Sequence, residues 1–260
     1  MILKVSHLVF SSNNFEDDCR RLPHLGYKNI FTDLNIENLE IKKPLFTNFN
    51  KLHDLSYFTL KNSLSIELLN WRTGNHRQSN FIPIFEGLDE KNLNSIKTKK
   101  IGNISLKQGN MKYFNIPICL LFKERFQLNK MLVKTSDILK SISFWKNLGF
   151  VLLEQNDDFA VLQLSSVLPG FYPFNLYLEK ANDINLEPCL DDNGISCISL
   201  LSSSVEQEKI KLSRQAIEIF EVGELLINQK LLNIIFIRGP CGELVEIIDL
   251  RAPIRISYYK

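Results

Sequence analysis

Residues 135–150 read TSDILKSISFWKNLGF, which has the start, apolar face and end of one short helix. Residues 135–137 offer helix N-caps, and residues 138–147 place apolar side chains along one face of a short helix. Gly149 ends that helix, because glycine readily takes the left-handed backbone conformation that follows a helix C-terminus. Short β-rich runs flank the helix on both sides. The stretch therefore predicts a strand, a helix and a second strand.

The same pattern occurs twice more in the chain. Residues 2–31 run from a β-rich strand through a helix with an apolar stripe to a glycine stop at Gly26. A third copy begins at Gly194, with a strand at 195–201 and a helix at 205–216. Each copy continues into two further β-rich segments, so its order is βαβββ.

Residues 71–127 lie where a fourth copy would be. Segments 81–85 and 116–122 are candidate strands, and the polar stretch between them shows no helical pattern. Both candidate strands contain proline, which favours edge positions in a sheet. We interpret this segment as a shortened module.

Composition excludes several classes of protein. The chain has 260 residues, 45% of them hydrophobic, which is enough for a substantial core. Its net charge of +2 gives no excess positive field for a nucleic-acid backbone, so we expect no nucleic-acid partner. No apolar run approaches the roughly 20 residues of a membrane-spanning helix, and we expect no membrane partner.

The cysteines and the N-terminus indicate a cytoplasmic location. Five Cys occur without CxxC spacing, which suits reduced thiols better than a disulfide framework or a zinc ribbon. The first residues lack the basic start, apolar region and cleavage site of a secretory signal.

Four segments carry a resemblance to a known family: 7–9 (HLV), 25–27 (LGY), 144–150 (FWKNLGF) and 239–247 (GPCGELVEI). They resemble the vicinal oxygen chelate superfamily, which includes glyoxalases, bleomycin-resistance proteins and extradiol dioxygenases. The resemblance covers residues 1–70 and 128–250 well and 71–127 poorly.

The resemblance implies the architecture. We expect an α+β protein whose tandem βαβββ modules form two incompletely closed barrels of mixed β-sheet, with the second module shortened. The predicted N-terminal domain spans 1–127, with modules at 1–70 and 71–127. The predicted C-terminal domain spans 128–260, with modules at 128–180 and 194–250. The resemblance leaves open whether modules pair within one chain or between the chains of a homodimer.

Enzymes of this superfamily hold a divalent metal with residues of the first and last strands of their modules, commonly His and Glu. In the first module these positions fall on His7 and Glu67, the predicted metal ligands. Imidazole and carboxylate suit iron, manganese, zinc or nickel. His7 on an apolar strand is equally compatible with a hydrogen-bonded core histidine.

The matching positions of the later modules fall on other residue types. They are Met131 and Tyr177 in the module at 128–180, and Cys197 and Glu246 in the last module. Met, Tyr and Cys are not the usual ligands of a hard metal. We therefore expect these four residues to line a metal-free pocket for a small organic molecule. The neighbours His53 and Asp54 face opposite sides of a strand, which argues against an acid–base pair.

Three hypotheses follow. In the first, the chain is a divalent-metal-dependent isomerase, lyase or dioxygenase that acts on an oxygenated organic substrate. In the second, it is a metal-free binder of a small molecule, as resistance proteins are. In the third, it is a non-catalytic interaction scaffold. The fold alone does not choose among them, because one fold hosts many chemistries.

Overall fold

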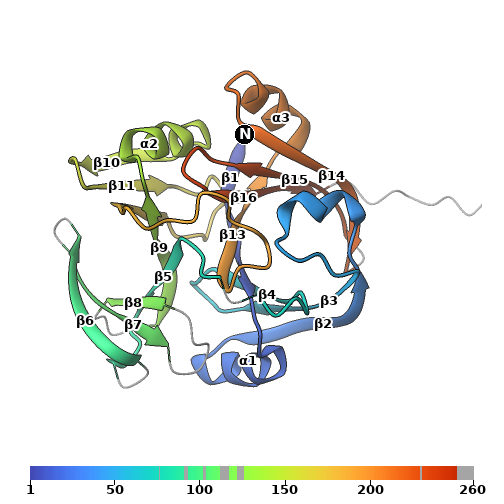
Figure 1. The fold of residues 1–260 in the computed structure, drawn as a ribbon, viewed down its shortest axis with the longest axis horizontal. Helices are drawn as coiled ribbons and strands as arrows, with labels where there is room; N and C mark the ends of the chain where they lie inside the picture. Colours follow the sequence, from blue (N-terminus) through green and yellow to red (C-terminus); the bar gives the residue numbers. More distant parts are fainter. Residues whose placement is uncertain are drawn as a thin grey trace, which may run out of the picture.

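The computed structural model describes residues 1–75, 77–90, 93–101, 104–111, 117–121, 126–228 and 230–250. Strands dominate these residues, and the longest of their helices has ten residues. No helix in these ranges combines the length and apolar character that crossing a membrane requires. The predicted α+β class is confirmed (Figure 1).

The first module has the predicted βαβββ order. Its elements are β1 (Ile2–Ser11), α1 (Phe15–Arg21), the 3₁₀ helix η1 (Leu22–Leu25), β2 (Lys28–Glu37), the 3₁₀ helix η2 (Glu40–Leu45), β3 (Leu52–Thr59) and β4 (Ser65–Asn70). Gly26 ends the helical segment with a φ of 88°, as its place in the sequence predicts.

The second module has two strands in place of a helix. Its elements are β5 (Phe81–Glu86), β6 (Leu93–Ile101), β7 (Ile104–Met111) and β8 (Pro117–Leu121). The edge positions predicted for the proline-containing strands are wrong. β5 pairs with β8 and β9, and β8 pairs with β5 and β7. A proline removes only one donor from a ladder, and Pro83 still lies opposite Met131 of β9.

The third and fourth modules follow the predicted order. The third contains β9 (Gln127–Thr135), α2 (Ile138–Asn147), β10 (Val151–Gln155), β11 (Phe159–Leu164) and β12 (Phe174–Lys180). The fourth contains β13 (Gly194–Ser202), α3 (Val205–Ser213), β14 (Glu218–Ile227), β15 (Lys230–Arg238) and β16 (Leu244–Leu250). α2 has its predicted bounds, and the Asp137 side chain accepts a hydrogen bond from the Lys140 backbone. α3 ends before its predicted end at Ala216, whose φ is 54°.

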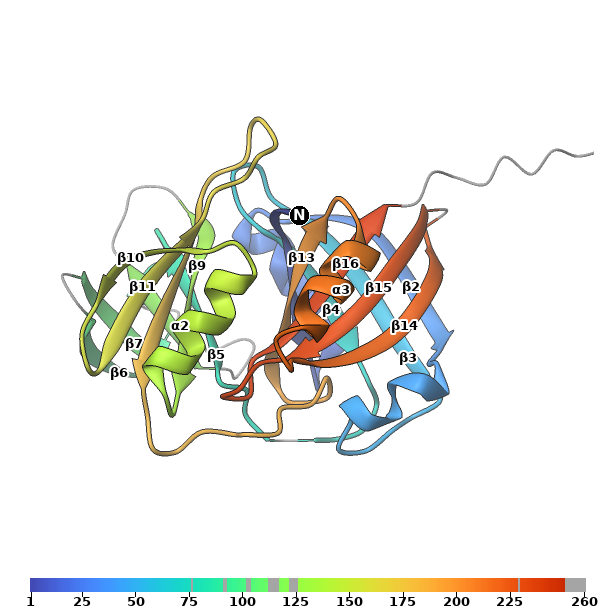
Figure 2. The same cartoon turned by 90° about the horizontal axis from the view of Figure 1, so that it is seen from above.

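The modules form two barrels that differ from the predicted pairing. β1 pairs with β13, so the first and fourth modules form one barrel, in the order β2-β3-β4-β1-β13-β16-β15-β14. We call it the first barrel. β5 pairs with β9, so the second and third modules form the second barrel, in the order β10-β11-β12-β9-β5-β8-β7-β6. Figure 2 shows the two groups of strands side by side.

This pairing does not follow the predicted domains, which joined neighbouring modules at 1–127 and 128–260. The reason is that each module offers the same kind of apolar first strand, and nothing in that pattern specifies its partner. The four modules are nested, with the middle two enclosed in sequence by the outer two. Since no described pairing joins β2 to β14 or β6 to β10, neither barrel is closed among the described residues.

Candidate metal centre

The strand register of the first barrel sets which side chains face its interior. β1 and β13 run antiparallel with Leu8 opposite Ile198, and both side chains are fully buried in the core that also holds the helices. Because strand side chains alternate, the neighbours of these residues face the barrel interior. His7 and Cys197 are therefore interior residues at matching places on the two strands.

The last strands of the two modules, β4 and β16, also carry residues at matching places. Glu67 of β4 lies beside Val9 of β1, and Glu246 of β16 lies beside Ser199 of β13. Val9 and Ser199 each stand two residues after the interior positions His7 and Cys197. The predicted first-strand and last-strand positions of the two modules thus meet in one barrel.

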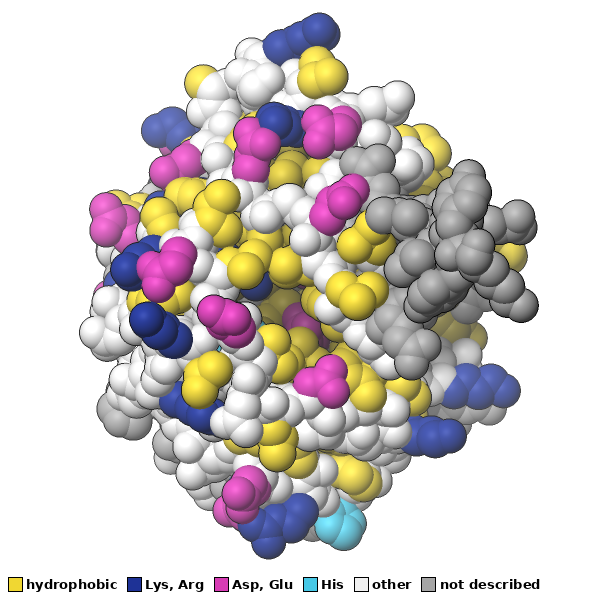
Figure 3. All heavy atoms as spheres, turned by 90° about the vertical axis from the view of Figure 1, so that its right-hand side faces the viewer, with side chains coloured by type: hydrophobic (Ala, Val, Ile, Leu, Met, Phe, Trp, Pro, Cys, Tyr) yellow, Lys and Arg dark blue, Asp and Glu magenta, His cyan; other side chains and the backbone are white. Residues whose placement is uncertain are grey.

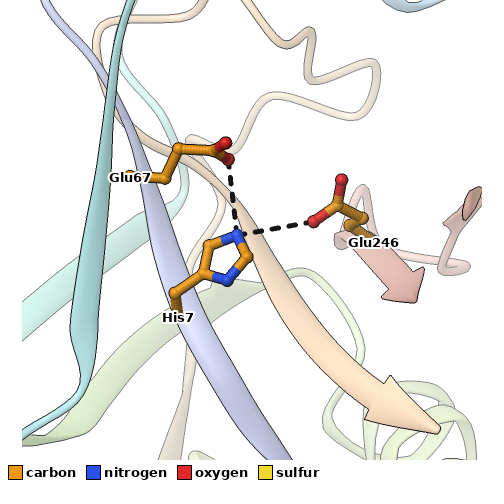
Figure 4. A group of neighbouring side chains, drawn as sticks. All are labelled: His7, Glu67 and Glu246. Atoms are coloured by element: carbon orange, nitrogen blue, oxygen red, sulfur yellow. Dashed lines mark ion pairs between the residues drawn. The ribbon is translucent and has the colours of Figure 1, made fainter. Parts of the chain in front are cut away.

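Three of these side chains converge (Figure 4). His7 Nε2 lies 3.3 Å from a Glu67 oxygen and 3.6 Å from a Glu246 oxygen. The three candidate ligand atoms all lie within 4.8 Å of one another. The side chains of His7, Glu67 and Glu246 are only 9%, 14% and 11% exposed, so the two carboxylates lie close together with little access to solvent.

The imidazole of His7 is held in one orientation. Its Nδ1 lies 3.1 Å from the hydroxyl of Ser6, and its ring meets the edge of Tyr57 at a centroid distance of 5.6 Å. Its Nε2 is buried and faces the carboxylates of Glu67 and Glu246. An imidazole fixed through one nitrogen and aimed at two carboxylates with the other has the arrangement of a metal-binding histidine.

The close packing of these three groups shifts their pKa values. Burial disfavours the charged imidazole, but Glu67 and Glu246 outweigh burial and raise the pKa of His7. Burial and the neighbouring Glu67 raise the pKa of Glu246. Burial acts against ionisation of Glu67 as well, yet His7 and Lys42 hold its pKa below the usual value. The cluster therefore gains stability from any positive charge placed inside it.

The distances fit a single divalent ion. Ligand atoms bound to one ion at about 2.0–2.2 Å lie roughly 3–4 Å from one another. The distances from His7 to Glu67 and Glu246 fall in that range, and all three candidate ligand atoms lie within 4.8 Å of one another. One imidazole and two carboxylates suit manganese, iron, zinc or nickel. Three protein ligands leave further positions of an ion open, which is typical of catalytic rather than structural sites.

Cys197 lines the same cavity as the two glutamates. Burial raises the pKa of its thiol well above the usual value, and Glu246 and Glu67 add to this effect. The thiol is therefore protonated at neutral pH and is a weak ligand until a metal displaces its proton. It occupies the place that corresponds to His7 in the other module.

Two cavities open onto the cluster. One of about 430 Å³ lies toward β2, β3, η2 and β14, and one of about 270 Å³ lies on the side of His7 and Tyr57. Glu67 and Glu246 line both. Figure 3 shows one face of the molecule on which hydrophobic side chains surround a hollow, with acidic and basic side chains inside it. The volume of the larger cavity is typical of a small-molecule site.

The second barrel does not contribute to this cluster. Tyr177 faces its interior and is packed in a mostly apolar group with Ile82 and Cys119. Met131 does not join Tyr177, because it faces the helix-side core with Leu8. Its neighbour Lys130 is the strand residue that turns away from that core, and it forms an ion pair with the buried Glu86 at 2.6 Å. The prediction of one pocket containing Met131, Tyr177, Cys197 and Glu246 is therefore wrong.

A slip of one residue explains the placement of Met131. Tyr177 lies beside Leu132, two residues after Lys130, just as Glu67 lies beside the residue two after His7. The position that matches His7 is therefore Lys130, and a shift by one residue turns a strand side chain to the opposite face. The strand carries no polar marker at 131 that would fix the register from sequence.

Sequence reasoning missed three polar residues of the larger cavity: Lys42, His53 and Trp71. Lys42 lies in η2, outside the repeated strands, so the repeat gives no signal for it. His53 does face away from Asp54, as its place on a strand predicts. Asp54 pairs with Arg72, whereas His53 stacks near Trp71 at a centroid distance of 4.8 Å.

No protein-family model matches the chain, and no curated protein matches it in sequence. Its structure is similar to that of glyoxalase I from Zea mays, with a TM-score of 0.62 and 12% identity over 95% of this chain and 92% of that chain. It is also similar to a proposed dioxygenase from Bacillus subtilis, with a TM-score of 0.62 and 10% identity over 95% and 85% of the two chains. At these identities the likeness establishes the fold alone, and the predicted glyoxalase-like fold is confirmed.

Proposed function

We propose, from a fold shared with glyoxalase I, that the first barrel is a divalent-metal enzyme site for a small oxygenated organic substrate. His7, Glu67 and Glu246 are the proposed ligands. The observation that carries this proposal is the convergence of their ligand atoms within 4.8 Å, with the buried His7 Nε2 facing both carboxylates.

The ion would act as a Lewis acid that stabilises negative charge developing on a substrate oxygen. The chain's own residues would do the rest. Ser6 and Tyr57 orient His7, and the apolar walls of the larger cavity exclude water from the substrate. This division of roles covers isomerases, lyases and dioxygenases alike, since each begins with a bound substrate oxygen.

Metal analysis tests the proposal. Protein purified without a metal-affinity tag should contain near-stoichiometric manganese, iron, zinc or nickel, or should bind added Mn²⁺ at one site in a calorimetric titration. Glu67→Gln should weaken Mn²⁺ at least as much as the 10–100-fold loss that removing a partner of a metal ligand causes. Glu179→Gln is the matched control, because Glu179 is a partly buried strand carboxylate of the second barrel. Failure of the wild type to bind any of these metals would refute the proposal.

A metal-free binding protein is the second candidate, and Lys42 favours it. Burial lowers the pKa of Lys42, but Glu246 and Glu67 favour its ammonium form, which partly neutralises them without an ion. In this case an organic cation or a hydrogen-bond donor would occupy the cluster. The titration separates the two candidates, because only the metal enzyme loses an ion with Glu67→Gln.

A further inference from the structure

The larger cavity of the first barrel contains a second polar group besides the candidate metal ligands. Lys42, His53 and Trp71 all line this cavity, whose remaining wall is largely apolar, with Leu55, Leu190 and Phe236 among its residues. His53 and Trp71 are only 6% and 4% exposed. Polar side chains at such depth normally have partners, so each one needs an explanation.

Two polar atoms of this group have no partner among the described residues: His53 Nδ1 and Trp71 Nε1. Burial lowers the pKa of His53 to about 4, with the charge of Lys42 adding to the effect, so the ring is neutral at pH 7. The backbone of Ile36 acts in the opposite direction and favours the protonated ring. A neutral imidazole has one donor and one acceptor nitrogen, while the indole N–H of Trp71 is a donor.

Lys42 supplies the charge of the group. It lies 5.9 Å from the centre of the Phe236 ring. Burial lowers the pKa of its ammonium group, and the charges of Glu246 and Glu67 act against this effect. The negative charges of these two carboxylates together balance one divalent ion. A metal bound by them therefore leaves Lys42 without a counter-charge inside the cavity, and an anionic ligand would keep its ammonium group protonated. The other acidic residues of the wall, Asp33 and Glu37, are exposed at its rim, where water screens them.

We propose that the metal-loaded cavity binds an apolar organic anion that carries a hydroxyl group. The carboxylate or equivalent anionic group of the ligand pairs with Lys42 and accepts the N–H of Trp71. The hydroxyl group, which can donate or accept, hydrogen-bonds His53 Nδ1, and the apolar walls cover the body of the ligand. This inference rests on the proposed function, because the charge of Lys42 is left over only when a divalent ion neutralises Glu67 and Glu246.

Calorimetry of Mn²⁺-loaded protein tests the anion. The probes are cyclopentane-, cyclohexane- and cycloheptane-carboxylate, each compared with its uncharged carboxamide of the same shape. At least one carboxylate should bind more tightly than its amide. Lys42→Met should weaken that carboxylate roughly 10- to 100-fold, as loss of a charged hydrogen bond does, and should leave the amide unchanged.

Two further variants guard the result against misfolding and non-specific charge effects. Lys42→Arg keeps the charge and should retain the preference for carboxylate. Lys43→Met is the matched control, because Lys43 is an exposed neighbour paired with Glu40 at 2.7 Å, outside the cavity. It should bind both probes as the wild type does.

The hydroxyl group has its own comparison. Trans-4-hydroxycyclohexane-carboxylate should bind more tightly than the unsubstituted acid in the wild type, and His53→Phe should abolish the difference. Equal binding of both acids to the wild type would show that the cavity does not recognise a hydroxyl group.

The outcomes separate this inference from the proposed function. If no Mn²⁺ binds, the proposed function fails, and the charge balance fails with it. If Mn²⁺ binds but no carboxylate is preferred over its amide, the inference alone is overturned. If the preference survives Lys42→Met, the anion pairs with the metal rather than with Lys42, and the inference is overturned as well.

Discussion

Cys197 stands where the symmetry of the first barrel places a fourth candidate ligand. Its thiol is fully buried, and burial and two carboxylates keep it protonated in the free protein. A thiolate suits zinc, whereas manganese prefers oxygen and nitrogen ligands. The choice of metal therefore decides whether this side chain takes part.

We predict that Cys197→Ser leaves the Mn²⁺ affinity unchanged and weakens Zn²⁺ by roughly an order of magnitude, about 1.4 kcal/mol. Titration of both metals into wild type and variant measures this. Cys119→Ser is the control, because Cys119 is a buried thiol inside the second barrel. Equal zinc affinity in wild type and Cys197→Ser would show that the thiol takes no part.

Asp18 of α1 is a buried carboxylate that lies outside the candidate site. Its side chain is 4% exposed, and it accepts a hydrogen bond from the Ser12 hydroxyl at 2.5 Å. Burial nevertheless raises its pKa from 3.8 to about 6. Because the folded-state pKa lies above the unfolded value, the stability it contributes is present below about pH 4 and is lost as the pH rises through 6.

Asp18→Asn should therefore raise the free energy of unfolding at pH 8 by up to roughly 3 kcal/mol and should have little effect at pH 4. Denaturant unfolding across this pH range measures the difference. Asp17→Asn, on the exposed side of the same helix, is the matched control variant. A gain for Asp18→Asn that is equal at pH 4 and pH 8 would contradict the assigned shift.

At the scale of elements, local chemistry was enough to predict the helices. α2 begins after the Asp137 cap and ends before Gly149, because both signals lie within the helix's own neighbourhood. Strand register is harder, since it depends on partners far along the chain. The assignment of Met131 failed for this reason, whereas His7, Glu67 and Glu246 all face the interior of the first barrel and converge there.

Two glycines allow the cost of backbone strain to be compared with the cost of a steric clash. Gly149 has a φ of 93°, and an added Cβ there would meet only Leu164 at an ordinary 3.7 Å. Gly242 has a φ of 83°, and its Cβ would lie 2.5 Å from the backbone oxygen of Asn185. We predict that Gly149→Ala costs about 1 kcal/mol, the strain alone. Gly242→Ala should cost more, because its backbone neighbour must also move.

Thermal and denaturant unfolding of the two variants tests this order. Both substitutions lie outside the candidate site, so metal binding should persist in any fraction that stays folded. An equal cost for Gly149→Ala and Gly242→Ala would show that the segment around Asn185 yields freely.

At the scale of the whole molecule, the pairing of modules could not be predicted from sequence. The first strands of the four modules are similarly apolar, so more than one pairing of modules is possible. The polar residues at their interior positions do not specify which first strands pair. The candidate metal centre follows from the pairing that forms. His7 and Glu67 alone are two ligands, and only the contact of β1 with β13 adds Glu246 and Cys197.

Breaking the chain between β8 and β9 tests this nested arrangement. The two pieces would share the β1–β13 and β5–β9 pairings, so we predict that they copurify as a one-to-one complex when expressed together. Each piece alone should aggregate or remain unfolded, because its central strands would lack their partners. Size-exclusion chromatography with circular dichroism measures both results. Two pieces that fold as separate stable monomers would contradict the nested pairing.

The nesting also governs how the protein emerges from the ribosome. His7 lies opposite Ser199, so β1 is made about 190 residues before the strand that receives it. At about 5–20 residues per second, translation of that interval takes roughly 10–40 s. Throughout it, one edge of the oldest strand has no native partner and is a target for chaperones or for mispairing with neighbouring chains. The middle modules meanwhile have all their own strands and can close first, so the candidate catalytic half of the molecule is the last to take shape.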